Sequence, residues 1–213
     1  MDQSTLVSRV ATRLNIDSND PLYSSLDEFV NEAIHYLETG SPDGWPWMRT
    51  RVTTTVTTGV YTFTQLDSTQ TISKILGLKV GSSTAGYNPL ELRSADEIDQ
   101  LYPDTTQTGL PESYLVEGST LRIYPTPDSS YTAEVRVVVT EDDLGGSSST
   151  PSLPVVFHTA IIDAALLFAY QALNDDRKTA TQESRVAQHV QRMRTYGQQY
   201  ESSPRIRVRE WLV

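Results

Sequence analysis

Histidines, paired carboxylates and glycine-rich stretches are the parts of this sequence that could carry chemistry, and we take the histidines first because they are frequent metal ligands. His35, His158 and His189 fall on three different predicted helices, and we expect none of them to have a second metal ligand three or four residues away. Zinc sites on helices use that spacing because it places two ligands on one face. The sequence therefore predicts no metal site and no cofactor.

Paired carboxylates are the second possibility, because acid and base catalysis often uses two of them. The pairs in this chain fall in predicted loops or at predicted helix ends, where solvation and the helix dipole account for them; they are Asp96-Glu97-Asp99, Asp142-Asp143 and Asp175-Asp176. The chain has no cysteine, and neither a phosphate-binding glycine loop nor the serine of a nucleophile elbow is present. We therefore predict no catalytic residues and no enzyme activity.

The charge of the chain restricts its partners. The 213 residues include 17 Lys and Arg against 27 Asp and Glu, a net charge of -10. This balance argues against a free nucleic-acid binder, because such a protein needs basic groups to neutralise phosphates. The charge is uneven, since residues 177–213 carry eight basic and three acidic side chains. An acidic body with a basic end favours contact with a neighbouring copy or an acidic partner.

No segment predicts secretion or a membrane span. The N-terminal residues lack the basic start and apolar run of a signal peptide, and the most apolar segment, 160–170, contains Asp163 and is shorter than a bilayer span. The lack of cysteine is typical of a reducing compartment. We therefore expect a soluble protein that makes no membrane contact and folds in the cytoplasm.

The N-terminal part of the chain has helical periodicity. Apolar residues recur at helical spacing over 6–14 and again over 22–37. Asp20 is a suitable N-cap for the second helix, and Gly40 follows its last turn. Two amphipathic helices are therefore expected.

The C-terminal part predicts two more helices of different character. Residues 154–173 are apolar on nearly all sides apart from a narrow polar stripe of Thr159, Asp163 and Tyr170, which indicates a buried central helix. Residues 178–200 have only a thin apolar stripe, so most of that helix should face water or polar contacts.

The residues between the helices have the character of strands. The β-branched run 51–57 and the run 60–63 flank Gly59 and predict a hairpin. A second hairpin is expected around the turn at 117–119. The remaining predicted elements are strands over 72–80, 87–92, 114–116, 121–124 and 131–139 and a short helix over 95–101.

Together these elements predict an α+β fold. We expect a four-helix bundle, made of two N-terminal and two C-terminal helices, with a β-rich insertion and an extended C-terminal arm. The expected parts are 1–40 and 154–203 for the bundle, 41–153 for the insertion and 204–213 for the arm.

Two further groups of residues are candidates for interaction. Trp45 and Trp47 flank Pro46, and we interpret them as a core at the junction between domains, because aromatic side chains bury large apolar areas. The last residues alternate basic and apolar side chains as a strand does but have no hairpin partner, so they could add to the sheet edge of a neighbour. The candidate docking residues are Arg205, Ile206, Arg207, Val208, Arg209, Trp211 and Leu212.

The order of these features resembles the head-to-tail adaptor proteins of tailed bacteriophages, also described as connector, head-completion or tail tubular protein A-like proteins. The similarity spans nearly the whole chain, and it is carried by a Trp-rich junction, a strand that ends in Tyr-Pro-x-Pro, and an apolar helix that opens with Leu-Pro. The segments are Gly44-Trp45-Pro46-Trp47, Gly59-Val60-Tyr61-Thr62-Phe63, Gly109-Leu110-Pro111-Glu112-Ser113-Tyr114, Leu121-Arg122-Ile123-Tyr124-Pro125-Thr126-Pro127 and Leu153-Pro154.

The resemblance implies a structural virion protein at the neck, assembled in the cytoplasm of the host bacterium. Such adaptors form a ring, typically of twelve copies, that binds the portal protein and a tail or nozzle protein and lets double-stranded DNA pass during genome ejection without binding it specifically. The resemblance implies that residues 205–213 are the arm that docks on the portal. An acidic lumen would repel the DNA backbone, and Asp142 and Asp143 are candidates for a loop that faces the lumen or the tail.

Two alternatives remain at this point. The chain could be a tail-associated module that binds carbohydrate or the host surface through Trp45, Trp47 and tyrosines. It could also be an enzyme with a glycosidase-like carboxylate pair.

Overall fold

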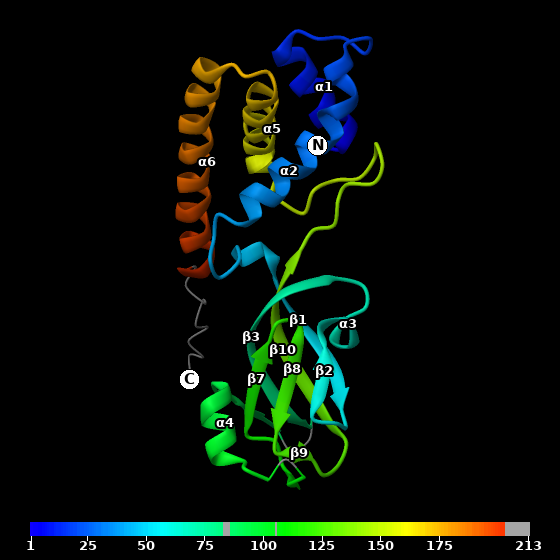
Figure 1. Cartoon of the computed structure of the whole chain (residues 1–213), viewed down its shortest axis with the longest axis vertical. Coiled ribbons are helices and arrows are strands. Elements are labelled where there is room, and N and C mark those ends of the chain that lie inside the picture. The colour runs from blue at the N-terminus through cyan, green and yellow to red at the C-terminus, as the bar shows by residue number, and fades with distance from the viewer. Residues whose placement is uncertain (83–85, 105, 203–213) are drawn as a thin grey trace, which may run out of the picture. The chain divides into compact units, whose positions relative to one another are not determined.

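The structure is a computed structural model that describes residues 1–82, 86–104 and 106–202, with side chains described as far as 199. The chain forms two compact units (Figure 1). One contains Met1–Ser41 together with the residues from Leu144 onward, and the other is Pro42–Asp143. We call them the helical unit and the β-rich unit.

The helical unit begins with α1 (Gln3–Leu14) and α2 (Leu26–Glu38). The side chain of Asp2 caps α1 by accepting a hydrogen bond from the Thr5 amide, and Asn15 ends it in a left-handed conformation. Asp20 caps a single turn of 3-10 helix, Pro21–Ser25, which leads into α2. Side-chain capping and a left-handed residue therefore set the two ends of α1, and Asp20 sets the start of the turn that leads into α2.

The helical unit is completed by a 3-10 turn (Val155–Phe157), α5 (His158–Ala172) and α6 (Asp176–Ser202). The loop before them is attached to α1, since the backbone amides of Gln3 and Ser4 donate to the carbonyls of Ser149 and Ser147. The chain thus returns from the β-rich unit to close the helical one.

Helix α5 forms the centre of the helical unit, because α1, α2 and α6 all pack against it. Ten of its fifteen side chains are buried, and they lie around most of its circumference, as a predominantly apolar helix requires. The expected four-helix bundle is wrong: the described residues form six α-helices and ten strands in three sheets. The physical reason is that a helix that is apolar on nearly all sides is surrounded by its neighbours and does not share one core with three equal partners.

The same helix is apolar enough to be compared with a membrane span. Val155–Ala172 has sufficient length and composition to cross a bilayer, and it is longer than the apolar run predicted from the sequence. Of this window, 61% is buried, and the core helices of soluble proteins meet the same criteria. Packing against three other helices accounts for its hydrophobicity.

The β-rich unit contains two four-stranded sheets and one short pair of strands. The first sheet has the order β1 (Arg49–Val56), β10 (Tyr131–Thr140), β3 (Thr71–Ser82), β4 (Gly86–Pro89). The second has the order β2 (Val60–Thr62), β8 (Thr120–Tyr124), β7 (Ser113–Glu117), β5 (Glu91–Leu92). Strands β6 (Thr108–Gly109) and β9 (Thr126–Pro127) pair in parallel, and the short helices are α3 (Phe63–Leu66) and α4 (Ala95–Leu101).

One of the two predicted hairpins is confirmed. β7 and β8 pair across the turn at Gly118, which has a φ of +57°. The hairpin predicted around Gly59 is wrong, because β1 pairs with β10 over eight residues while β2 pairs with β8 in the other sheet. A long strand that gains eight cross-strand partners outcompetes a local pairing with a strand of three residues.

The core of the β-rich unit is apolar and draws on both four-stranded sheets. The first sheet contributes residues such as Val80, Val135 and Val137, and the second contributes Leu121 and Ile123. The opposite face of the first sheet is polar, so its strands alternate between core and surface as antiparallel strands commonly do.

Candidate functional site

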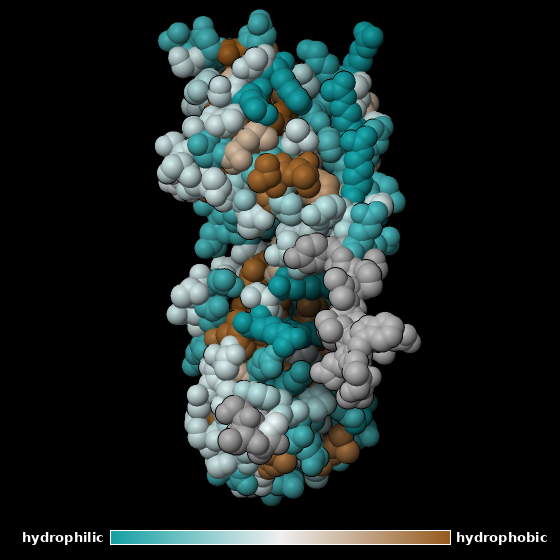
Figure 2. All heavy atoms as spheres, turned by 180° about the vertical axis from the view of Figure 1, so that it is seen from behind, coloured by the Kyte–Doolittle hydropathy of each residue, from teal (hydrophilic) through white to brown (hydrophobic). Residues whose placement is uncertain are grey.

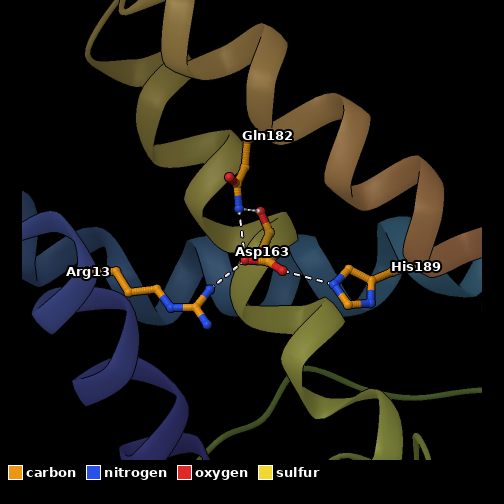
Figure 3. Close-up of polar contacts among 4 residues, drawn as sticks. All are labelled: Arg13, Asp163, Gln182 and His189. Carbon is orange, nitrogen blue, oxygen red and sulfur yellow. Dashed lines mark hydrogen bonds and ion pairs between the residues drawn. The ribbon is translucent and has the colours of Figure 1, made fainter.

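The most densely connected polar group of the helical unit surrounds Asp163 on α5 (Figure 3). Asp163 is 7% exposed and accepts hydrogen bonds through both carboxylate oxygens. Its Oδ1 accepts from Arg13 Nη1 at 2.5 Å and from Gln182 Nε2 at 3.0 Å, and its Oδ2 lies 2.9 Å from His189 Nε2. We call these four residues the Asp163 network.

The Asp163 network joins three helices. Arg13 lies in the last turn of α1, while Gln182 and His189 lie two turns apart on α6. Gln182 also donates to the backbone carbonyl of Asp163 at 3.0 Å. Because a buried carboxylate is costly unless it is fully paired, the network favours one arrangement of α1 and α6 on α5.

The pair Asp163 and His189 has the form of the base and orienting acid of a hydrolase. Within the part of the chain that the structure describes, no hydroxyl side chain hydrogen-bonds to His189. The carboxylate already binds three side chains from neighbouring helices, so the arrangement is suited to holding helices together.

The end of the helical unit formed by the last turns of α6 exposes apolar side chains. Val155 and Val156 are 73% and 65% exposed, and Tyr196 of α6 packs edge-on against Phe157 with ring centroids 5.2 Å apart. Together they border a shallow hollow of about 420 Å³, which is lined by Val156, Phe157, Gln191, Arg192, Thr195, Tyr196 and Gln199. We call this surface the terminal patch, and Figure 2 shows hydrophobic side chains gathered on the helical unit. Exposed apolar groups of this kind are typical of an interaction surface.

The predicted docking arm, Arg205 to Val213, lies outside the described residues. The last described residue is Ser202, at the end of α6. In the sequence, two residues separate Arg205 from the end of α6, whose last turns line the terminal patch.

The two predicted aromatic residues lie at the start of the β-rich unit. Trp45 and Trp47 stack with ring centroids 5.2 Å apart and planes within 6°, on either side of Pro46. Trp45 is only 2% exposed. A buried indole cannot offer its face to a sugar, so this geometry weakens the interpretation as a carbohydrate site.

Asp142 and Asp143 are exposed at the end of the β-rich unit. Asp142 accepts a hydrogen bond from Thr71 Oγ1 at 2.9 Å. It also lines a hollow of about 380 Å³ whose other residues are mostly hydroxyl-bearing or acidic. The structure thus places these carboxylates on the surface, where they can offer a partner negative charge and hydrogen-bond acceptors.

The three histidines lie apart, each with its own contacts. The expectation that no histidine has a second possible ligand at helical spacing is wrong for His35. Glu38 lies three residues further on, with 3.4 Å between His35 Nδ1 and Glu38 Oε2. The buried His158 donates from Nε2 to the Leu153 carbonyl, and burial lowers its pKa from the ordinary value of 6.5. Among the residues described, no group of three or more metal-binding side chains comes together.

Sequence reasoning missed the partners of Asp163. The polar stripe on the central helix was the available signal, and it identified Asp163 itself. Gln182 is 3% exposed although it lies in a predominantly polar helix, so composition alone could not separate it from its exposed neighbours. Arg13 is distant in sequence, and only the packing of α1 on α5 brings it to the carboxylate.

Comparison with known proteins assigns these features to a family. The family model described as SU10 adaptor protein matches residues 1–209. No curated protein matches the sequence. The order of segments that resembled phage adaptors lies within the matched range, and the resemblance is thereby confirmed. With 209 of 213 residues matched, the chain belongs to the SU10 adaptor protein family, a family of phage head-to-tail adaptors.

Proposed function

We propose that this phage adaptor forms a ring of twelve copies beneath the portal, extends the DNA channel and provides the platform for a tail or nozzle protein. The observation that carries the proposal is the family match over nearly the whole chain. Membership of that family implies a structural protein at the neck of the virion that interacts with portal and tail. The number of copies in the ring, the extension of the DNA channel and the platform for the tail are the finer points that we propose in addition.

The arm, Arg205 to Val213, is the part that we assign to the portal. Arg205, Arg207 and Arg209 alternate with apolar residues, so an extended arm would present a basic face and an apolar face. Such a strand can add to the edge of a partner's sheet and use its charges to select an acidic partner. The terminal patch supports the assignment, since it places exposed apolar groups on the last turns of α6, the helix that precedes the arm in the sequence.

The acidic charge of the chain supports passage of DNA without binding. A net charge of -10 disfavours contact with phosphates, so a channel lined by such a protein would let a duplex slide. We assign Asp142 and Asp143 to a surface that faces the channel or the tail. The proposed role requires no enzyme activity, no cofactor and no membrane, and assembly would take place in the cytoplasm of the host.

A deletion tests the role of the arm. Removal of 205–213 should leave a folded protein by circular dichroism that no longer joins portal particles in electron micrographs. A charge-matched pair of variants sharpens the test: R205Q/R207Q/R209Q should weaken joining, while R177Q/K178Q/R185Q on α6 should leave it intact. Normal joining by the deleted protein would overturn the assignment of the arm.

A further inference from the structure

The β-rich unit concentrates its basic side chains on one face. Residues 42–143 contain seven Lys and Arg against fourteen Asp and Glu. Two of the seven, Arg93 and Arg122, are paired with nearby glutamates. The other five lie on the polar face of the sheet β1-β10-β3-β4 by strand register, and they are Arg49, Arg51, Lys74, Lys79 and Arg136. We call this surface the basic sheet face.

Register makes two arginines direct cross-strand neighbours at its centre. Arg51 of β1 is the cross-strand partner of Arg136 of β10, and Gly77 of β3 lies on the other side of Arg136. Like charges opposite each other destabilise an antiparallel pair. Arg51 is relieved by its ion pair with Glu134, which leaves Arg136 as the cation that an external negative group can bind.

The available carboxylates do not neutralise the face. Arg51 Nη1 forms an ion pair with Glu134 Oε1 at 2.5 Å, and Lys74 Nζ forms one with Asp43 Oδ1 at 2.8 Å. Arg136 makes no ion pair with any residue that the structure describes. Among the described residues, Lys79 and Arg136 are thus cations of the basic sheet face without an ion pair, on a unit that is negative in total.

The centre of the face is also open. A Cβ atom placed on Gly77 would meet only Arg136 Nε, at 4.0 Å. Arg49, Arg51 and Arg136 border a hollow of about 470 Å³ together with Thr50 and Leu76. A partner can therefore approach the guanidinium groups closely enough for charge-assisted hydrogen bonds.

We propose that the basic sheet face binds the acidic surface of the β-rich unit of a neighbouring copy. Outside this face the unit carries twelve carboxylates and only two basic residues, and Asp96, Glu97 and Asp99 of α4 are all exposed. Each copy thus offers both halves of a complementary pair on different surfaces. Contacts of that kind are heterologous and produce rings when they close.

The inference rests on the proposed ring but can fail separately from it. Duplex DNA is the competing partner for a basic surface. We favour the neighbouring copy because its acidic groups lie outside the basic sheet face and can meet that face in a head-to-tail contact, whereas a duplex would also approach the acidic surfaces that border it. The test must therefore measure binding to both candidate partners, the neighbouring copy and duplex DNA.

A single charge reversal provides the test. Arg136→Glu places a carboxylate opposite Arg51, so the fold should be retained or slightly stabilised, which a thermal melt will show. Self-association at low ionic strength, measured by analytical ultracentrifugation, should weaken about tenfold or more because like charges then meet across the contact. The matched control is Arg122→Glu, which changes the charge equally at an arginine on the other sheet and should shift association less than about threefold.

Four outcomes decide the matter. Salt-sensitive association that is lost in R136E but kept in R122E supports the proposal. Equal effects of the two variants, or complete rings of R136E on the portal, overturn it while leaving the adaptor role intact. Binding of a short duplex DNA by the wild-type chain that R136E abolishes, with unchanged self-association, overturns it in favour of nucleic acid. A wild-type chain that does not join the portal defeats the proposed function, and the self-association assay still decides the contact.

Discussion

The helical unit and the β-rich unit treat polar side chains in opposite ways. Five of the six buried polar residues among the described positions lie in the helical unit: Gln3, Glu38, His158, Asp163 and Gln182. The β-rich unit buries only Ser113 and keeps its charges on the surface. The register of a sheet is set by its alternating buried and exposed side chains and by its turns, because a slip of one residue would move every buried side chain to the surface. Helices that pack through apolar side chains can rotate and slide, and a buried carboxylate with three partners supplies the helical unit with the specificity that this alternation gives to the sheets.

The largest loss of stability is expected for the substitution of Asp163, the side chain on which the contrast between the two units depends. Asp163→Ala leaves Arg13, Gln182 and His189 without their common acceptor. Breaking a buried ion pair from one side costs about 3 kcal/mol, so the free energy of unfolding should fall by about that amount in denaturant melts. Asp163→Asn should cost less, and Glu183→Ala, an exposed neighbour of Gln182, should cost almost nothing. A loss at Asp163 no greater than that at Glu183 would show that the network does not hold the helices.

In the β-rich unit, a substitution that strains the backbone and overpacks the core should cause a comparable loss of stability. Gly44 has a φ of +68°, and a Cβ there would lie 2.4 Å from Val138 Cγ1. Gly44→Ala should therefore destabilise the protein by about 2 kcal/mol, from overpacking and left-handed strain together. Gly118 has a φ of +57° with no atom within 4 Å of such a Cβ, so Gly118→Ala isolates the strain at about 1 kcal/mol. Equal losses for both variants would contradict the clash with Val138.

Much of this molecule is visible in its sequence because local signals agree with the final contacts. The second amphipathic helix, the buried apolar helix and the turn at Gly118 were all predicted from patterns that involve neighbouring residues, although Asp20 caps the 3-10 turn before the second helix and not the helix itself. The pairing of β1 with β10 was missed because strands 75 residues or more apart leave no local trace of their register.

The Asp163 network and the basic sheet face could likewise be predicted only as far as neighbouring residues in the sequence reveal them. Asp163 stood out as a polar residue on an apolar helix, but Arg13 lies 150 residues away and only packing identifies it as a partner. The basic sheet face was also invisible, since Arg51 and Arg136 become neighbours only through strand register. Charge counts along the chain cannot reveal a patch that two distant strands assemble.

Acidification should affect the helical unit through His158. Burial lowers the pKa of His158 below its ordinary value of 6.5, so the unfolded chain takes up a proton at a higher pH than the folded one. Its contribution to stability is present above pH 6.5 and declines as the pH falls from there through the lower pKa of the folded protein. Thermal midpoints between pH 7.5 and 5.5 should show the decline. His158→Gln, which can still donate to the Leu153 carbonyl but does not titrate, should flatten the curve, and an unchanged slope would exclude this origin.

The smallest effect is expected for an ion pair on the surface of the β-rich unit. Arg122 and Glu117 are 43% and 49% exposed, with 2.8 Å between Nε and Oε2. Glu117→Ala should change the free energy of unfolding by about 0.5 kcal/mol or less, because exposed pairs gain little over their solvated ions. A loss as large as that of Asp163→Ala would remove the contrast between the two units.

The central claim is that this family member works as an adaptor ring, and electron microscopy tests it most directly. The purified chain is mixed with the portal protein of its phage, and the mass and symmetry of the particles are determined. The account predicts a second ring of twelve copies attached to the portal. Portal particles without added density, beside a chain that stays monomeric, would contradict it.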